Sequence, residues 1–191
     1  MTAPPKPARE VRIVGGTLRR SKLPVADRPG LRPTPDRVRE TLFNWLGGDL
    51  SGWRVLDAFA GSGALGFEAA SRGAAPVLLL ERDPLLARSL EASRERLKLG
   101  TDQLRVQTAD ALAWMRRAPP AGFELVLLDP PFDAGLLPQA LAAAATLLAP
   151  GGWLYAESPT ELSEAALPAG LTPWRQGRAG AVFYHLLHRN T

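Results

Sequence analysis

The chain has 191 residues, of which 46% are hydrophobic, and a formal net charge of +4. This length allows one substantial buried core and is short for two full domains. The sequence contains no cysteine, which excludes disulfides, thiolate metal sites and cysteine nucleophiles and fits a cytoplasmic protein. No apolar run is long enough to cross a bilayer, and His185 and His188 have no metal-like partner set. Neither a membrane nor a metal is therefore expected as a partner.

The positive charge is concentrated near the N-terminus. Residues 1–40 carry ten Lys or Arg against four Asp or Glu, a balance of +6, whereas the remainder has a balance of −2. This asymmetry fits a basic arm for a polyanion on a nearly neutral body. A solvated terminus explains the charge equally well. The proline-rich residues 1–10 are expected to form a disordered tail.

A hairpin is predicted after this tail. Residues 11–14 alternate apolar and charged side chains, as in a half-buried strand. Gly15-Gly16 then indicates a turn, and residues 17–20 return as a second short strand. A loop follows as far as Thr34, which is expected to cap a helix with its hydroxyl, with Pro35 in the first helical position.

From residue 53 onward the pattern is an alternation of strands and helices. Apolar runs, each typical of a strand, lie at 53–57, 76–81, 104–107, 124–129 and 152–157. Helical stretches between them lie at 64–72, 84–99, 110–117 and 135–148. Continuous apolar runs suit strands covered on both faces, so the fold class is α/β with a doubly wound, mostly parallel sheet. The runs at 171–176 and 181–188 predict a closing hairpin with an antiparallel strand.

A glycine loop follows the first strand of this alternation. Gly61, Gly63 and Gly66 satisfy the pattern G-x-G-x-x-G, and Glu81 ends the next strand, so both a dinucleotide and S-adenosylmethionine fit. Asp57 favours the second, because a carboxylate beside an anionic pyrophosphate would cost free energy. S-adenosylmethionine instead presents a sulfonium and an ammonium to the loop.

The other predicted cofactor contacts also lie at strand ends. Glu81 can accept hydrogen bonds from both ribose hydroxyls, and Asp110 can hold the adenine amino group while it caps the following helix. The residues expected to bind S-adenosylmethionine are Asp57, Phe59, Gly61, Ser62, Gly63, Glu81, Arg82, Asp110 and Ala111.

The tetrapeptide Asp129-Pro130-Pro131-Phe132 ends the run at 124–129 and would face the methyl donor, because ligands in open α/β sheets lie beyond the carboxyl ends of strands. An exocyclic amine on a nucleobase is a poor nucleophile. The Asp129 carboxylate and the Pro130 carbonyl can accept its hydrogens, while the prolines fix the backbone. Phe132 offers a face on which an extracted base can stack. The sequence therefore predicts direct in-line methylation of such an amine, dominated by positioning.

The glycine loop and this tetrapeptide together resemble the amino methyltransferases of DNA, RNA and protein glutamine. Residues 12–16, 22–24 and above all 32–46 (RPTPDRVRETLFNWL) resemble the RsmD family, bacterial enzymes that methylate N2 of one guanine in small-subunit (16S) ribosomal RNA. The resemblance implies a seven-stranded, Rossmann-like methyltransferase fold over 34–191 and an N-terminal hairpin and loop over 11–33 that helps engage RNA. It also implies action on an assembled or partly assembled subunit, and a monomer is expected.

The basic arm gives the predicted RNA contacts. Side chains expected to bind phosphates are Arg12, Arg19, Arg20, Lys22, Arg32, Arg37 and Arg39. Of these, Arg37 or Arg39 could instead face the cofactor or pair with Glu40. Two other functions stay open: the same chemistry on DNA adenine or protein glutamine, and a non-catalytic ribosome assembly factor.

Overall fold

The computed structural model describes residues 9–191. The tail predicted over residues 1–10 therefore lies mainly outside the described residues. Its last two members do not fit that prediction, because Arg9 and Glu10 belong to the first strand.

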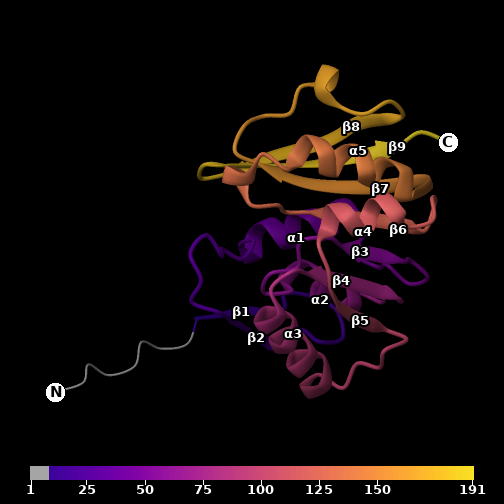
Figure 1. Ribbon diagram of the computed structural model, residues 1–191. Coiled ribbons are helices and arrows are strands. Elements are labelled where there is room, and N and C mark those ends of the chain that lie inside the picture. Colours follow the sequence, from indigo (N-terminus) through magenta and orange to yellow (C-terminus); the bar gives the residue numbers. More distant parts are fainter. Residues whose placement is uncertain (1–8) are drawn as a thin grey trace.

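The core of the molecule is a seven-stranded sheet in the order β5-β4-β3-β6-β7-β9-β8 (Figure 1). All ladders in it are parallel except those of β9, which runs antiparallel to both neighbours. The strands are β3 (Val55–Asp57), β4 (Val77–Glu81), β5 (Leu104–Thr108), β6 (Phe123–Leu128), β7 (Leu148–Ser158), β8 (Leu171–Ala179) and β9 (Val182–Arg189). The predicted α/β fold with a closing antiparallel strand is confirmed.

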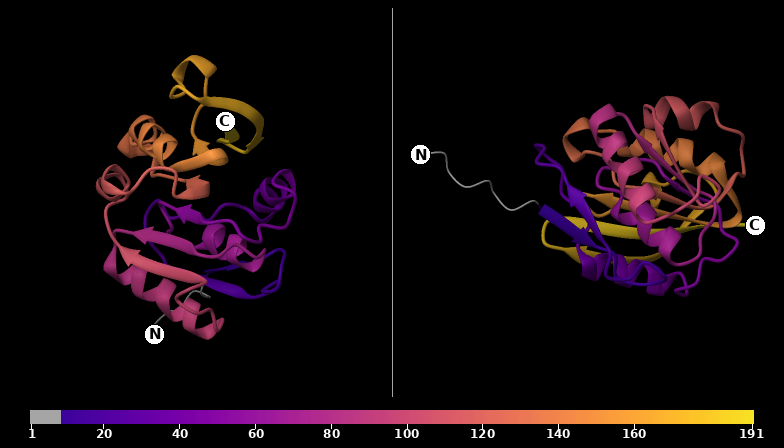
Figure 2. Two further views of the ribbon diagram at one scale, coloured as in Figure 1. Left: turned by 90° about the vertical axis from the view of Figure 1, so that its right-hand side faces the viewer. Right: turned by 90° about the horizontal axis from the view of Figure 1, so that it is seen from below.

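Helices cover both faces of this sheet (Figure 2). They are α1 (Asp36–Trp45), α2 (Ala64–Ser71), α3 (Pro84–Arg96), α4 (Ala111–Arg117) and α5 (Leu137–Leu147), with short 3-10 turns η1 (Phe132–Ala134) and η2 (Glu164–Ala166). The first three helices contribute to one buried cluster, and α4 and α5 contribute to the other. No helix within residues 9–191 is both long and apolar enough to cross a membrane.

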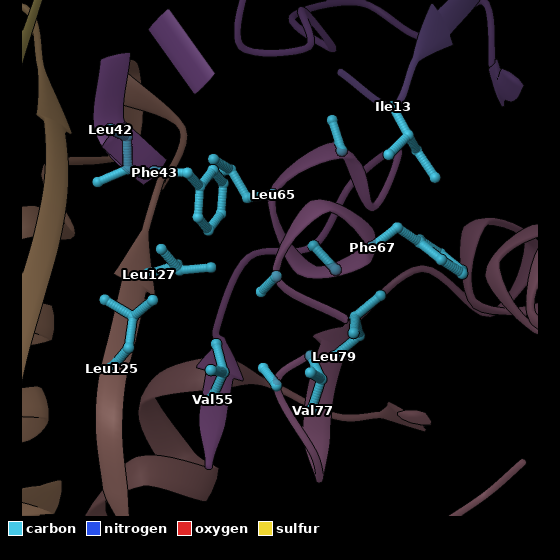
Figure 3. Close-up of a cluster of buried hydrophobic side chains, with 14 of the residues drawn as sticks. Ile13, Leu42, Phe43, Val55, Leu65, Phe67, Val77, Leu79, Leu125 and Leu127 are labelled. Atoms are coloured by element: carbon cyan, nitrogen blue, oxygen red, sulfur yellow. The ribbon is translucent and has the colours of Figure 1, made fainter. Parts of the chain in front are cut away.

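The first cluster fixes α1 and α2 over the middle of the sheet (Figure 3). Leu42 and Phe43 of α1 and Phe67 of α2 are fully buried there, above Val55 of β3 and Leu127 of β6. Each such side chain contributes on the order of 1.5–3 kcal/mol by its removal from water. This packing holds the first turn of α1 and the start of α2 at the same edge of the sheet.

The N-terminal hairpin differs from its prediction. Strand β1 (Arg9–Arg12) pairs with β2 (Lys22–Val25), so the return strand does not lie at 17–20. Gly16 does open a turn, since its carbonyl accepts from the Arg19 amide at 3.3 Å, and this segment also docks on α2. A Cβ on Gly16 would lie 1.9 Å from the carbonyl oxygen of Ser71, and the Thr17 amide donates to that oxygen at 2.7 Å. The glycines thus serve a close approach of two backbones.

This hairpin is packed into the body of the protein. Val11, Ile13, Leu23 and Val25 are buried in the same cluster as α1 and α2. The side chain of Glu68 on α2 is also fully buried and accepts hydrogen bonds from the Val14 and Gly15 amides, both at 2.8 Å. Residues 9–25 are therefore held in a fixed place against the sheet.

Candidate active site at the carboxyl edge of the sheet

The glycine loop joins β3 to α2 and is braced by Glu81. The Gly61 amide donates to one carboxylate oxygen of Glu81 at 2.9 Å, and the Asp83 amide donates to the other at 2.9 Å. Gly63 has a left-handed backbone, with φ 81°, and forms the N-cap of α2. A Cβ on Gly61 would lie 2.9 Å from Leu31, so the segment before α1 closes over this loop.

Asp57 ends β3 beneath the loop and is 1% exposed. Its Oδ2 accepts from the Gly66 amide at 3.0 Å, while Oδ1 is the single buried side-chain polar atom in residues 9–191 that has no hydrogen-bond partner. Burial raises the pKa of Asp57 to about 7, and the nearby carboxylates of Glu81 and Glu157 act in the same direction. A buried acid with an unpaired oxygen fits a cationic ligand, which would restore its ionised form.

The remaining predicted cofactor residues lie around this centre. The Ala109 amide donates to the carbonyl of Glu81 at 3.1 Å, which brings the end of β5 beside the end of β4. Asp110 caps α4 as predicted, accepting from the Ala113 amide at 2.8 Å. Ala111 is buried, Phe59 and Ser62 are half-buried, and the Arg82 side chain is exposed.

The tetrapeptide lies in the same edge, after the neighbouring strand. β6 is hydrogen-bonded to β3 on one side and to β7 on the other, and Leu127 is in register with both Asp57 and Tyr155. Asp129 therefore follows β6 next to the end of β3. Pro130 is buried, Pro131 is exposed, and Phe132 opens η1 with 39% of its surface exposed. An exposed aromatic ring three residues after a half-buried acid can hold a flat ligand that carries an amine.

One residue of this edge was missed by sequence reasoning. Glu157 of β7 is 5% exposed, and its Oε1 accepts hydrogen bonds from the Thr34 hydroxyl at 2.6 Å and the Tyr155 hydroxyl at 2.9 Å. The prediction that Thr34 caps α1 is thus wrong: Pro35 occupies the N-cap position and no side chain caps the helix. The signal for Glu157 was an acid ending an apolar run, as Asp57 does.

Glu157 and Asp129 form a pair. Burial raises the pKa of Asp129 well above its ordinary value, and the adjacent carboxylates of Glu157 and Asp57 raise it further. Burial also raises the pKa of Glu157, against hydrogen bonds from Thr34 and Tyr155 that lower it. The edge thus gathers three acids with raised pKa values.

The predicted RNA-binding residues are only partly brought together. Arg12 and Lys22 are cross-strand partners in the hairpin and line a hollow together with Thr34 and Asp36. Both are also ion-paired, Arg12 with Asp36 at 3.2 Å and Lys22 with Glu10 at 2.9 Å. These contacts are exposed and therefore weak, so either side chain can exchange its partner for a phosphate.

The other arginines of the arm differ in exposure. Arg19, Arg20, Arg32 and Arg37 are all exposed at the surface, whereas Arg39 is not. Since residue 17 docks on the last residue of α2, Arg19 and Arg20 lie toward the end of that helix remote from the glycine loop, about 12 Å along its axis.

The prediction that Arg39 binds RNA phosphates is wrong. Its side chain is 0% exposed and cannot reach RNA, because it bonds Glu68 at 3.0 Å, Asp36 and the Thr34 carbonyl. Its partner is therefore not Glu40. Burial lowers the pKa of Arg39, and the carboxylates of Glu68 and Asp36 oppose that shift.

A seven-stranded sheet of this order, with acids ending its central strands around a glycine loop, defines a methyltransferase of Rossmann-like fold. The model of the family described as "Conserved hypothetical protein 95" matches residues 11–188. The chain belongs to this family, and its resemblance to the RsmD family is confirmed.

Known relatives cover almost the whole chain. The chain is 43% identical to "Ribosomal RNA small subunit methyltransferase D" of Escherichia coli (strain K12), over 94% of this chain and 90% of that protein. It is 40% identical to the protein of the same name in Haemophilus influenzae, over 93% of each. The solved structure of yhhF from Escherichia coli superposes with a TM-score of 0.83 at 41% identity, covering 95% of this chain and 99% of that one.

Proposed function

We propose that this methyltransferase uses S-adenosylmethionine to methylate the exocyclic N2 amine of a guanine in small-subunit ribosomal RNA. The observation that carries the proposal is that Asp129 follows β6 next to the end of β3, close to Asp57, with Phe132 three residues further on at the start of η1. The names of the two relatives support ribosomal RNA as the substrate class.

The residues present fit S-adenosylmethionine. Asp57 offers a buried oxygen without a partner, which suits a cationic ligand, and Glu81 offers a carboxylate at the loop for ribose hydroxyls. Gly61 and Gly63 keep the backbone free of side chains there, and Asp110 stands at the end of β5 for the adenine amine. When bound, the cofactor supplies an electrophilic methyl group.

The chain binds the target amine and orients it. A carboxyl oxygen of Asp129 and the carbonyl oxygen of Pro130 accept one hydrogen bond each from the target nitrogen. Because these acceptors hold both N–H hydrogens, they turn the single lone pair of the nitrogen toward the glycine loop. Phe132 stacks on the extracted base. Such positioning in a partly desolvated site accounts for catalysis without a covalent link to the protein.

The RNA is held by the basic arm, within a partly assembled or assembled subunit in the cytoplasm. Arg12 and Lys22 lie on the hairpin that docks against α2, so phosphates bound to them would be held at a fixed distance from the sheet edge. Arg19, Arg20, Arg32 and Arg37 extend this surface. Phosphate contacts set the register of the RNA, and the sheet edge reads the base.

The test is methyl transfer from tritiated S-adenosylmethionine to small subunits from an E. coli strain that lacks the 43% identical relative. The wild-type chain should label the ribosomal RNA, and Asp129→Ala should abolish labelling while cofactor affinity stays within a few-fold. Asp133→Ala, an exposed acid in the same loop, is the matched control and should remain active. Near-normal single-turnover transfer by Asp129→Ala would contradict the proposed role of Asp129.

A further inference from the structure

A buried carboxyl that the reaction above does not use lies beside Asp129. β6 and β7 are parallel, with Leu128 in register with Ala156, so Asp129 and Glu157 are the next pair along the two strands. Both follow residues of the first cluster, Leu127 and Tyr155, by two positions. Because side chains alternate along a strand, both carboxyls point to the face of the sheet that α1 covers.

The register of β6 and β7 places the two carboxyls side by side, and the neighbouring Glu157 carboxylate raises the pKa of Asp129. Two adjacent ionised carboxylates repel each other, and an ionised carboxylate only accepts hydrogen bonds, so close contact between these two groups requires one proton between them. Oε1 of Glu157 already accepts from two hydroxyls, and such donors favour the ionised form of Glu157. The proton therefore resides on Asp129 and is directed at Glu157.

The surroundings reinforce a single negative charge on the pair. Asp57 of β3 faces Asp129, and the hydroxyls of Thr34 before α1 and Tyr155 of β7 face Glu157. Tyr184 of β9 lies next to Tyr155. Among the ion pairs of residues 9–191, none involves Asp129 or Glu157, so no cation offsets a second negative charge.

We infer that Glu157 is a positioning residue for methyl transfer: anchored by Thr34 and Tyr155, it shares one proton with Asp129 and thereby fixes the carboxyl of Asp129 with its other oxygen toward the target amine. This inference rests on the role proposed above for Asp129. It also assigns a role to the segment before α1. The Thr34 hydroxyl orients Glu157, and Glu157 in turn orients Asp129.

The shared proton can be tested in the protein without cofactor or RNA. Wild type and Glu157→Gln are unfolded with urea at a series of pH values from 5 to 9. A folded-state proton with a raised pKa stabilises the fold at low pH and is lost as pH rises. The urea midpoint of wild type should therefore fall relative to that of Glu157→Gln across this range. Parallel midpoints would overturn the shared proton.

Positioning is tested by single-turnover transfer to the same small subunits. Glu157→Ala should lower the rate by roughly tenfold to a hundredfold, the cost of misplacing a reacting group, with the KM for S-adenosylmethionine unchanged. Glu157→Gln should recover most of this loss, because its amide can donate to Asp129 in place of the proton. The rate of wild type should decline at alkaline pH, where the shared proton leaves, and the rate of Glu157→Gln should not.

Matched variants of α1 and the segment before it separate positioning from general stability. Thr34→Val removes a hydroxyl that holds Glu157 and should slow transfer, whereas Thr41→Val, whose hydroxyl bonds the Arg37 carbonyl within α1, should not. Equal pH profiles for wild type and Glu157→Gln would overturn the inference. If wild type methylates no guanine, the proposed function fails, and the urea series still decides whether the proton is shared.

Discussion

The raised pKa of Asp57 makes cofactor binding depend on pH in a defined direction. With a pKa of about 7, this acid is mostly neutral at pH 6 and mostly ionised at pH 8. A cationic ligand favours the ionised form, so protons and cofactor compete for Asp57. The affinity of the wild-type chain for S-adenosylmethionine should therefore fall by about tenfold from pH 8 to pH 6. Asp57→Asn cannot ionise, so its weaker affinity should be independent of pH in this range.

The same shift has an effect on stability, whose sign follows from linkage. The folded-state pKa of Asp57 lies above its ordinary value of 3.8, so the stability that the neutral acid provides is complete below pH 4 and is lost as pH rises to 7. The full shift corresponds to about 4 kcal/mol. Asp57→Asn should flatten this part of the stability curve. Calorimetry of both proteins at pH 6, 7 and 8 checks the binding effect, and identical pH slopes would refute the assignment of Asp57 to a cationic ligand.

Three other perturbations test separate parts of the account. Glu81→Ala should weaken S-adenosylmethionine by on the order of 1.5–3 kcal/mol, the range for hydrogen bonds to a charged group, and calorimetry showing unchanged affinity would exclude the ribose contact. Replacement of Arg19 and Arg20 together should reduce the slope of log RNA affinity against log salt concentration by roughly 0.7–0.9 per lost contact. Cofactor affinity should not change. An unaltered slope would show that neither arginine contacts RNA. Glu68→Ala leaves the buried Arg39 without its main partner and should cost about 3–5 kcal/mol of unfolding free energy, measured by urea denaturation, where a loss below about 1 kcal/mol would contradict the buried ion pair.

Sequence reasoning works where the signal is local. The central strands are apolar runs long enough to be recognised, and acids that end such runs must lie at one edge of a parallel sheet. The amino-acid pattern alone therefore places Asp57, Glu81 and Asp129 together. Glu157 carries the same signal, and it was missed because no glycine loop or proline directly follows it to mark a site.

The errors share a physical cause, which is pairing between distant segments. In the sequence Arg39 looks like any other arginine of the basic arm, because its partner Glu68 lies 29 residues further along the chain. Thr34 has the pattern of a helix cap, yet its hydroxyl is used 123 residues away by Glu157. Gly16 opens the predicted turn, but nothing local in the sequence indicates that the backbone of Ser71 lies against it. Local propensity cannot reveal such tertiary partners.

The central claim, methylation of a guanine amine in ribosomal RNA, is tested most directly by identifying the modified nucleoside. Small subunits from the relative-deficient E. coli strain are incubated with the wild-type chain and tritiated S-adenosylmethionine, and their RNA is digested to nucleosides and separated. The account predicts that the label appears as N2-methylguanosine and is absent with Asp129→Ala. Label in methylated adenine or in protein glutamine, or no transfer by a folded chain that binds the cofactor, would contradict it.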